Sequence, residues 1–381
     1  MDRPFEAELG ALFPERRPLY PDNHNNFAVA GRRVLITGAG GSIGSALARR
    51  ILRASPRRLI LLDHSEQAIY ELRRELDTCD QTDVTRFVPG DMRDGELVES
   101  LLAEEKPDFI FHAAAFKHVP LLEGNPFAAI ENNGLATWRL ARTAAKFGAS
   151  RLLLISTDKA ANPRSMLGVS KRLAELAILR WNSLRSRMSA LRLGNVAGSS
   201  GSVLPIFREQ ILRGGPLTVT HPEVTRYFLT LDETCAAIGA LACASDASGL
   251  FVPEMGEPVS IIQVAQRMIH VSAAVVKNDA EVRVEITGLR PGDKLHEDLL
   301  SHGETLGKKV TPRIRAICGK KIHAELLDAK FLMLEEITKR RDLSALLKLL
   351  REILPEYQPL SRAPIQPMKT RSIAAAGAGD D

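Results

Sequence analysis

Two neighbouring side chains, Asp158 and Lys159, could serve as the acid and the base of one reaction. They directly follow an apolar run at residues 152–156, which is typical of a buried strand. A carboxyl group stays protonated at neutral pH only in surroundings of low polarity, and an amine accepts a proton only if burial or cationic neighbours lower its pKa. We expect a buried pair at the end of a strand. The alternative is a surface turn with both charges in water.

A glycine-rich segment near the start of the chain predicts a dinucleotide-binding loop. Gly38, Gly41 and Gly44 follow an apolar run and open a helical pattern. This spacing allows a tight turn, close approach of a pyrophosphate, and close packing of the helix on the strand. Ser42 and Ile43 would place their backbone N–H groups at the start of the helix, where phosphate binds well.

Asp63 ends a second apolar run about 20 residues further on, where a carboxylate can bind the ribose hydroxyls of NAD and repel the 2′-phosphate of NADP. NAD is therefore the expected cofactor, with NADP less favoured. The alternative is an ordinary glycine turn with Asp63 capping a helix. Together with the acid–base pair, the loop predicts hydride transfer coupled to an elimination.

Short β-rich runs alternate with longer helical patterns. The predicted strands are residues 34–37, 59–62, 85–88, 109–112, 152–156 and 190–193, and examples of predicted helices are 44–53, 66–76 and 137–147. This alternation predicts an α/β fold with a doubly wound parallel (Rossmann) sheet and ligands beyond the carboxyl ends of its strands.

The chain divides into several expected units. We expect an N-terminal arm at 1–30, an NAD-binding Rossmann domain at 31–200 to which 228–255 return, and a smaller C-terminal substrate-binding lobe made of 201–227 and 256–358. Residues 359–381 are small and polar and predict a disordered tail.

Other strand ends add candidate cofactor contacts. Asp91 and Met92 follow the third predicted strand, and the small residues Ala113 and Ala114, which would let backbone approach a flat cofactor, follow the fourth. Lys117, in the same loop, is a candidate for substrate binding. We interpret His112 as structural and Asn133 as a brace between the fourth and fifth strands.

Composition excludes several classes of protein. The net charge of +5 is modest, and only 5% of residues are aromatic, so a nucleic-acid platform has no support. The four cysteines are far apart, which predicts reduced thiols and no metal site. No run approaches about 18 apolar residues, and the N-terminus has no signal-peptide pattern. We expect a cytoplasmic protein without a membrane span.

Several spaced segments match one family. They are LDHSE (62–66), AFKHVP (115–120), STDKA (156–160), GNV (194–196), TVTHP (218–222), TRYF (225–228) and GLRPGDK (288–294). Over roughly residues 28–302 the chain resembles the extended short-chain dehydrogenase/reductase superfamily. More narrowly, it is similar to the nucleotide-sugar 4,6-dehydratases of polysaccharide biosynthesis that act on UDP-N-acetylglucosamine.

The resemblance implies a mechanism in which hydride leaves sugar C4 for NAD, water is eliminated across C5 and C6, and hydride returns to C6. It implies that Asp158 is the acid, Lys159 the base, and Thr157 the group that holds the C4 oxygen. Lys171 matches the lysine that binds the nicotinamide ribose. A UDP-sugar would be the substrate and a homo-oligomer the expected assembly.

The chain departs from the superfamily at Leu167, where most members have a tyrosine that takes the substrate hydroxyl proton. A methionine stands there in one subgroup, which keeps the C5 configuration. The C4 proton would then pass to another group, such as Lys171, Lys159 or water. Leu167 itself, with Met166, either lines the sugar site or simply packs.

Four further residues match substrate-binding positions of the family. Arg226 and Arg290 suit a diphosphate, and Asn195 and Glu297 suit groups near the uracil or ribose. Without the resemblance, each arginine could equally form a surface ion pair. Two other functions stay open: a sugar-nucleotide epimerase or related oxidoreductase, and a catalytically silent nucleotide-sugar-binding protein.

Overall fold

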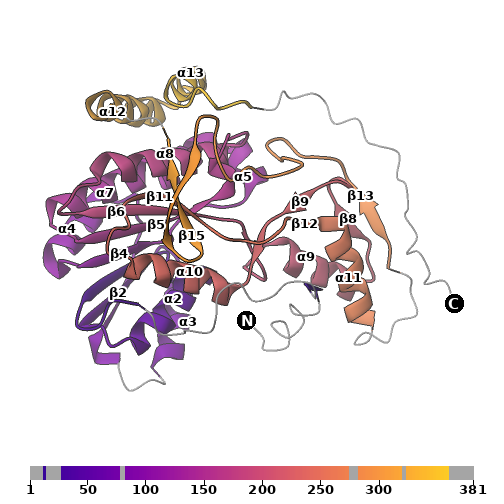
Figure 1. Ribbon diagram of the computed structural model, residues 1–381, viewed down its shortest axis with the longest axis horizontal. Helices are drawn as coiled ribbons and strands as arrows, with labels where there is room; N and C mark the ends of the chain where they lie inside the picture. Colours follow the sequence, from indigo (N-terminus) through magenta and orange to yellow (C-terminus); the bar gives the residue numbers. More distant parts are fainter. Residues whose placement is uncertain (1–11, 14–26, 78–81, 274–281, 320–322, 360–381) are drawn as a thin grey trace.

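A nine-stranded sheet forms the centre of the computed structural model, which describes residues 12–13, 27–77, 82–273, 282–319 and 323–359 (Figure 1). In spatial order the strands are β14 (Thr305–Thr311), β15 (Ile314–Cys318), β11 (Gly249–Pro253), β6 (Arg187–Leu193), β5 (Arg151–Thr157), β4 (Phe109–His112), β1 (Arg33–Thr37), β2 (Arg58–Asp63) and β3 (Thr85–Pro89). Seven of these strands, from β11 to β3, run parallel to one another. β15 pairs antiparallel with β11, and β14 pairs antiparallel with β15.

All six predicted strands are present, so the doubly wound Rossmann fold is confirmed. The chain runs outward from β1 to β2 and β3, and then returns to the other side of β1 to form β4, β5 and β6. This reversal places the switch point between β1 and β4, where α/β proteins bind ligands beyond the strand ends. The strands read as continuous apolar runs because helices bury both faces of the sheet.

Helices cover the two faces in separate layers (Figure 1). One layer holds α4 (Gly95–Glu105), α7 (Ala136–Lys146) and α8 (Met166–Trp181), and the other holds α2 (Ser42–Arg53), α3 (Glu66–Leu76) and α10 (Leu231–Cys243). Short helices α5 (Val119–Gly124) and α6 (Pro126–Ala129) and a π-helical turn at Ile130–Leu135 lead from β4 into α7; a 3₁₀ turn at Thr82–Val84 precedes β3. Side-chain caps fix several helix starts. Ser165, for example, accepts a hydrogen bond from the Gly168 N–H at the start of α8.

A smaller lobe has its own apolar core. It contains α9 (Val203–Leu212), β8 (Leu217–Val219), β9 (Thr225–Arg226), β12 (Val259–Ser260), α11 (Ile261–Ala273) and β13 (Val284–Ile286). The two-residue strands β7 (Asn195–Val196) and β10 (Phe228–Leu229) pair with each other between the lobe and the large sheet. Leu12 and Phe13 belong to the lobe core, and the Phe13 ring packs in a tilted orientation on that of Phe228, with ring centroids 5.2 Å apart, so this part of the expected arm lies on the lobe.

The segment that we expected to complete the lobe instead joins the large domain from residue 305 onward. Strand β15 pairs with β11 and extends the central sheet. Helices α12 (Ala324–Arg340) and α13 (Leu343–Ile353) pack on α7 and α8 through a second apolar core, in which Phe331 stacks on Trp138 with ring centroids 5.4 Å apart. The boundary at 256–358 is therefore wrong in its second half. β15 pairs with the edge of β11 that would otherwise be open, and α12 and α13 cover the apolar outer face of α7 and α8.

Within the described residues, no helix is long and apolar enough to cross a membrane. Apart from residue 359, the tail predicted at 359–381 lies outside the described residues.

Candidate active site

The turn that follows β5 carries the predicted acid and base. β5 ends at Thr157, and Asp158–Ala160 forms one 3₁₀ turn capped by the Thr157 hydroxyl, which accepts the Lys159 N–H at 3.4 Å. A Cβ at Gly168 would lie 2.3 Å from the Lys159 carbonyl oxygen, so only glycine lets α8 start this close to the turn. We missed Gly168 in the sequence, where the signal was a glycine in the first turn of a helix.

Asp158 and Lys159 form a buried ion pair. Asp158 is fully buried, and the Lys159 Nζ lies 3.0 Å from the Asp158 Oδ1. The Thr157 hydroxyl donates to the same oxygen at 2.9 Å. The other oxygen of Asp158, Oδ2, is buried and has no hydrogen-bond partner among the described residues. The interpretation as a solvated surface turn is therefore wrong.

Glu297 and Asn195 complete the cluster around Lys159. The Lys159 Nζ lies 3.3 Å from the Glu297 Oε1 and 3.2 Å from the Asn195 Oδ1. Glu297 Oε2 is a second buried oxygen without a partner among the residues that the structure describes. Both residues thus stand at the acid–base pair, whereas the resemblance suggested contacts near uracil or ribose.

Burial and charge set the protonation of this cluster. Burial raises the pKa of Asp158, and the Glu297 carboxylate raises it further against the opposing effect of Lys159. Burial alone would lower the pKa of Lys159, but Asp158 and Glu297 outweigh it and hold that pKa above its ordinary value. The lowered lysine pKa expected for a base is therefore not found, and the raised pKa favours the cationic form of Lys159.

Arg226 serves this cluster from the lobe. Its Nε lies 3.5 Å from the Glu297 Oε1. Its Nη1 donates to the carbonyls of Thr225 and Leu295, and its Nη2 donates to that of Lys294. These hydrogen bonds hold the guanidinium in place, so that its contact with Glu297 can orient that carboxylate. Arg290, the other predicted arginine, is half exposed and pairs with Asp293 at 3.1 Å.

Lys171 lies one helical turn after Leu167 on α8. Its Nζ donates to the Ile155 carbonyl at 2.6 Å, and burial lowers its pKa to about 8. Leu167 is buried in the apolar core shared by α8 and the C-terminal helices, which favours the packing interpretation of this residue.

The glycine loop has the geometry of a backbone cradle. Gly38 has a φ of +70°, and a Cβ there would lie 2.5 Å from the Ala114 nitrogen; a Cβ at Gly44 would lie 2.0 Å from the Gly38 oxygen. Helix α2 starts at Ser42 after Gly41 with no side-chain cap, so its first N–H groups are directed at the loop. Ser42 also contacts the lobe connection, because its hydroxyl accepts the Ser200 N–H at 3.1 Å.

Asp63 binds this loop through one carboxylate oxygen and the N-cap residue of α3 through the other. Oδ2 accepts the Gly40 N–H and Oδ1 accepts the Ser65 N–H, each at 2.9 Å. We did not single out Gly40 in the sequence, although a Cβ there would lie 2.4 Å from that of Ala68. The carboxylate is thus fixed at the end of β2, next to the start of α2.

The remaining candidates lie around the same strand ends. Met92 is buried, and Asp91 pairs with Arg93, whose side chain lowers the Asp91 pKa. Ala113 continues the β1–β4 pairing by donating its N–H to the Thr37 carbonyl. Lys117 lies in the loop after β4 and is exposed as a whole residue. Protein atoms around its amine nevertheless remove part of the water there, which lowers the pKa of Lys117.

Two polar residues act as structural braces. Buried His112 contacts the hydroxyls of Thr37 and Thr137 at 2.6 and 2.8 Å, and burial lowers its pKa to about 3. Asn133 bonds the backbone of Phe116 and the Ser170 hydroxyl, and so ties the loop after β4 to α8 and not to β5. Among the described residues, no group of three or more His, Cys, Asp or Glu side chains is arranged to hold a metal.

A Rossmann sheet with this glycine loop is the fold of the short-chain dehydrogenase/reductases. The profile of the polysaccharide biosynthesis protein family matches residues 34–318, and the chain belongs to this family.

Named relatives and a solved structure agree with this family. The probable polysaccharide biosynthesis protein EpsC of Bacillus subtilis (strain 168) is 41% identical over 288 residues, which are 75% of this chain and 48% of that protein. The chain thus spans about half the length of this relative. A UDP-N-acetylglucosamine 4,6-dehydratase (inverting) of Campylobacter jejuni is 28% identical over 281 residues, 72% of this chain and 79% of that protein. The X-ray structure of Pen from Bacillus thuringiensis superposes with a TM-score of 0.70 at 28% identity, over 77% of this chain and 90% of that one.

Proposed function

We propose that this chain dehydrates a UDP-N-acetylhexosamine, with UDP-N-acetylglucosamine as the first candidate, to a 4-keto-6-deoxy sugar nucleotide for polysaccharide biosynthesis. The observation that carries the proposal is the buried Asp158–Lys159 pair at the end of β5. Elimination of water needs both an acid and a base, and this pair provides one of each in direct contact. The similarity to a UDP-N-acetylglucosamine 4,6-dehydratase supports the substrate class.

The residues around the switch point fit NAD. Gly38 and Gly44 leave room for backbone contact, the uncapped start of α2 suits a pyrophosphate, and Asp63 suits ribose hydroxyls. NAD bound there would accept a hydride from sugar C4 and return it to C6. Lys171 would bind the nicotinamide ribose with its buried amine.

The ion pair becomes an acid–base pair when Asp158 gains a proton and Lys159 loses one. The resulting protonated carboxyl and neutral amine, 3.0 Å apart, carry the same net charge as the ion pair. Lys159 can then take the C5 proton while Asp158 protonates the departing C6 hydroxyl. The elimination regenerates the ion pair that the structure shows.

The Thr157 hydroxyl offers a route for the C4 proton that Leu167 cannot accept. It donates to the Asp158 Oδ1 at 2.9 Å, so a proton released from the C4 hydroxyl can pass through Thr157 to that carboxyl. Oxidation at C4 comes before the elimination, so this proton makes Asp158 the acid, and the Lys159 ammonium releases its own proton to water. The C4 proton then leaves with the C6 hydroxyl as water, and a solvent proton is taken up at C5. This balances the protons of the reaction without a tyrosine.

Removing the charge of Glu297 should move the pH dependence of dehydration to lower pH. The Glu297 carboxylate raises the pKa of Lys159 and of Asp158, so Glu297→Gln lowers both. A base with a lower pKa is neutral at lower pH, and an acid with a lower pKa loses its proton at lower pH, so both limbs of the kcat/KM profile shift in the acidic direction. Arg226 and Lys294, the other charges that act on Glu297, are unchanged in this variant.

The matched control for this profile is Glu99→Gln. Glu99 is an exposed carboxylate on α4 that pairs with Lys146. The pH profile of this variant should match that of the wild type. A profile that does not move in Glu297→Gln, or that moves equally in Glu99→Gln, would contradict the role given to Glu297.

Replacing Asp63 should weaken NAD binding and relax the discrimination against NADP. Asp63→Ser removes a charged hydrogen-bond acceptor worth about 1.5–3 kcal/mol, which corresponds to roughly 10- to 100-fold in the Kd of NAD. Titration calorimetry with both cofactors measures the change. Asp77→Asn, at the end of α3, is the control. Unchanged affinities in Asp63→Ser would place the cofactor's ribose elsewhere.

Mass spectrometry against a panel of nucleotide sugars tests the proposed function. Loss of water from a UDP-N-acetylhexosamine, with a 6-methyl signal by NMR, supports it. Inversion at C4 without loss of water would instead make the protein an epimerase, and tight binding without turnover would make it a silent binding protein. The homo-oligomer and the cytoplasmic location expected from the sequence remain predictions.

A further inference from the structure

One short segment, residues 294–304, carries Glu297 to the acid–base pair and crosses from the lobe to the large domain. At its lobe end, the Arg226 guanidinium donates to the carbonyls of Lys294 and Leu295, at 2.9 and 3.0 Å. The Lys294 Nζ in turn donates to the Ala161 carbonyl at 2.8 Å, directly after the catalytic turn. This end is therefore fixed both to the lobe and to the turn.

At the other end, a single fully buried arginine holds the segment. Arg192, on β6, has five N–H donors, and all five make hydrogen bonds. Its acceptors are the Leu299 carbonyl at 3.0 Å, the Glu304 carboxylate at 2.6 and 3.1 Å, and the Glu175 carboxylate at 2.8 and 2.9 Å. Leu299 and Glu304 belong to the segment, and Glu175 belongs to α8.

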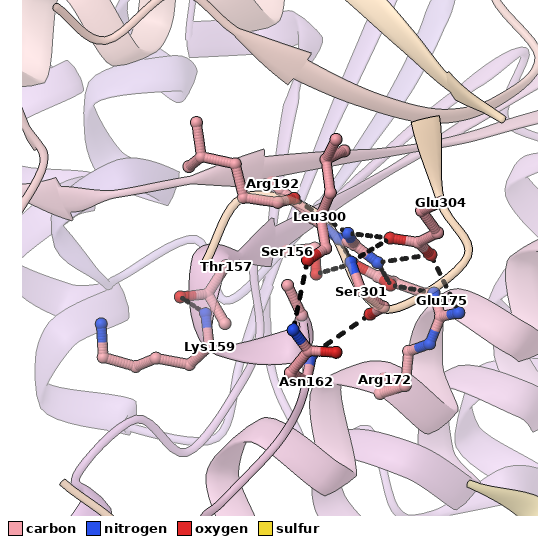
Figure 2. A network of polar contacts seen from close by, with 12 residues as sticks. Ser156, Thr157, Lys159, Asn162, Arg172, Glu175, Arg192, Leu300, Ser301 and Glu304 are labelled. Carbon is pink, nitrogen blue, oxygen red and sulfur yellow. Dashed lines mark hydrogen bonds and ion pairs between the residues drawn. The ribbon is translucent and has the colours of Figure 1, made fainter. Parts of the chain in front are cut away.

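The same network reaches the catalytic turn (Figure 2). The Ser156 hydroxyl donates to the Glu175 Oε1 at 2.7 Å, directly before Thr157. Asn162 bonds residues 300–302 three times, including the His302 N–H to its Oδ1 at 2.9 Å. Figure 2 shows the Lys159 side chain pointing away from this network. The network therefore supports the turn on the side opposite the Lys159 amine and does not contact that amine.

Stability alone does not account for this arrangement. Arg172 joins Arg192, Glu175 and Glu304 in a buried set of charges, with side chains between 0% and 12% exposed. Arg172 also pairs with Glu356 at 3.3 Å. Taking such charges out of water has a large desolvation cost, and well-packed apolar side chains often stabilise a core as well or better. The planar fork of an arginine does, however, fix the relative positions of the three chain segments that it joins.

We propose that Arg192 is a positioning residue for the dehydration: by holding Leu299 and Glu304 it keeps the 294–304 segment in register with the catalytic turn, and so keeps Glu297 against Lys159. This inference rests on the proposed function for its catalytic consequence. The positioning itself can be measured without any substrate.

The test is Arg192→Lys, which keeps the positive charge but loses the planar guanidinium that contacts all three chain segments. Hydrogen–deuterium exchange of the substrate-free protein should show faster exchange in peptides covering 294–304. The kcat for dehydration should fall roughly 100-fold, as for a catalytic group displaced by about 1 Å, with little change in KM. The pH profile should shift in the same direction as that of Glu297→Gln, because Glu297 moves away from Lys159. A purely structural role would leave that profile in place.

The matched control is Glu105→Gln. Glu105 is also buried and also binds two arginines, Arg58 and Arg86, but at the amino end of the sheet. It should lower stability without changing exchange at 294–304 or the pH profile. Glu304→Gln is the second variant, and it tests the proposal if Arg192→Lys does not fold. We expect smaller changes in the same direction as in Arg192→Lys: faster exchange at 294–304, a lower kcat and a shifted pH profile.

Unchanged exchange at 294–304 in Arg192→Lys and Glu304→Gln would overturn the proposal, as would equal changes in Glu105→Gln. If the wild type fails to dehydrate any nucleotide sugar, the proposed function fails. The exchange measurement still decides whether Arg192 holds the segment.

Discussion

Asp158→Asn is expected to lose dehydration by about 10²–10⁴-fold while the protein keeps its cofactor. The asparagine side chain has nearly the same shape, but it cannot donate a proton to the C6 hydroxyl or accept one from the Thr157 hydroxyl, which lies 2.9 Å from the carboxyl. The glycine loop and Asp63 lie on other strands and are unaffected. Mass spectrometry of the product measures the first effect, and cofactor titration measures the second.

Glu99→Gln is the control, because it removes an exposed carboxylate on α4 that pairs with Lys146. It should dehydrate at the wild-type rate. A rate in Asp158→Asn within a few fold of the wild type would show that some other group is the acid.

Lys159→Arg is expected to lose both dehydration and proton exchange at C5, again by about 10²–10⁴-fold. The arginine keeps a cation between Asp158 and Glu297, so the two buried carboxylates stay compensated and the fold survives. Its pKa, above about 12, prevents it from acting as a base. Deuterium incorporation from D₂O, followed by NMR, separates the exchange from later steps.

Lys309→Arg provides the matched control, since Lys309 is exposed on β14 and pairs with Glu254. It should exchange and dehydrate like the wild type. Retained C5 exchange in Lys159→Arg would assign the base to another group, with Lys171 the nearest alternative on α8.

Local patterns predicted the Rossmann half of the molecule well. The six strands and the glycine loop are encoded by short apolar runs and by residue spacing, because parallel strands buried on both faces are continuously apolar. The position of Asp158 and Lys159 at a strand end was predictable for the same reason. The edge strand β14 was not, because its sequence TLGKKVT alternates poorly and contains a glycine.

The contacts that define the chemistry could not be predicted from local patterns. Glu297 reaches Lys159 only through the tertiary fold, and it reverses the expected direction of the lysine's pKa. Arg192 and Glu175 sit within an ordinary-looking strand and helix, where a charged residue at a buried position was the only available signal. Their role depends on a third segment, around Glu304, from a part of the chain that we had assigned to the lobe.

Incubation of the wild-type protein with NAD and UDP-N-acetylglucosamine in D₂O tests the central claim most directly. The account predicts a product that has lost water and carries one deuterium at C5, because elimination removes the C5 proton and a solvent-derived proton replaces it. Unreacted sugar recovered with no deuterium and no loss of water, under conditions where NAD is bound, would contradict the assignment of Asp158 and Lys159 as an acid–base pair for dehydration.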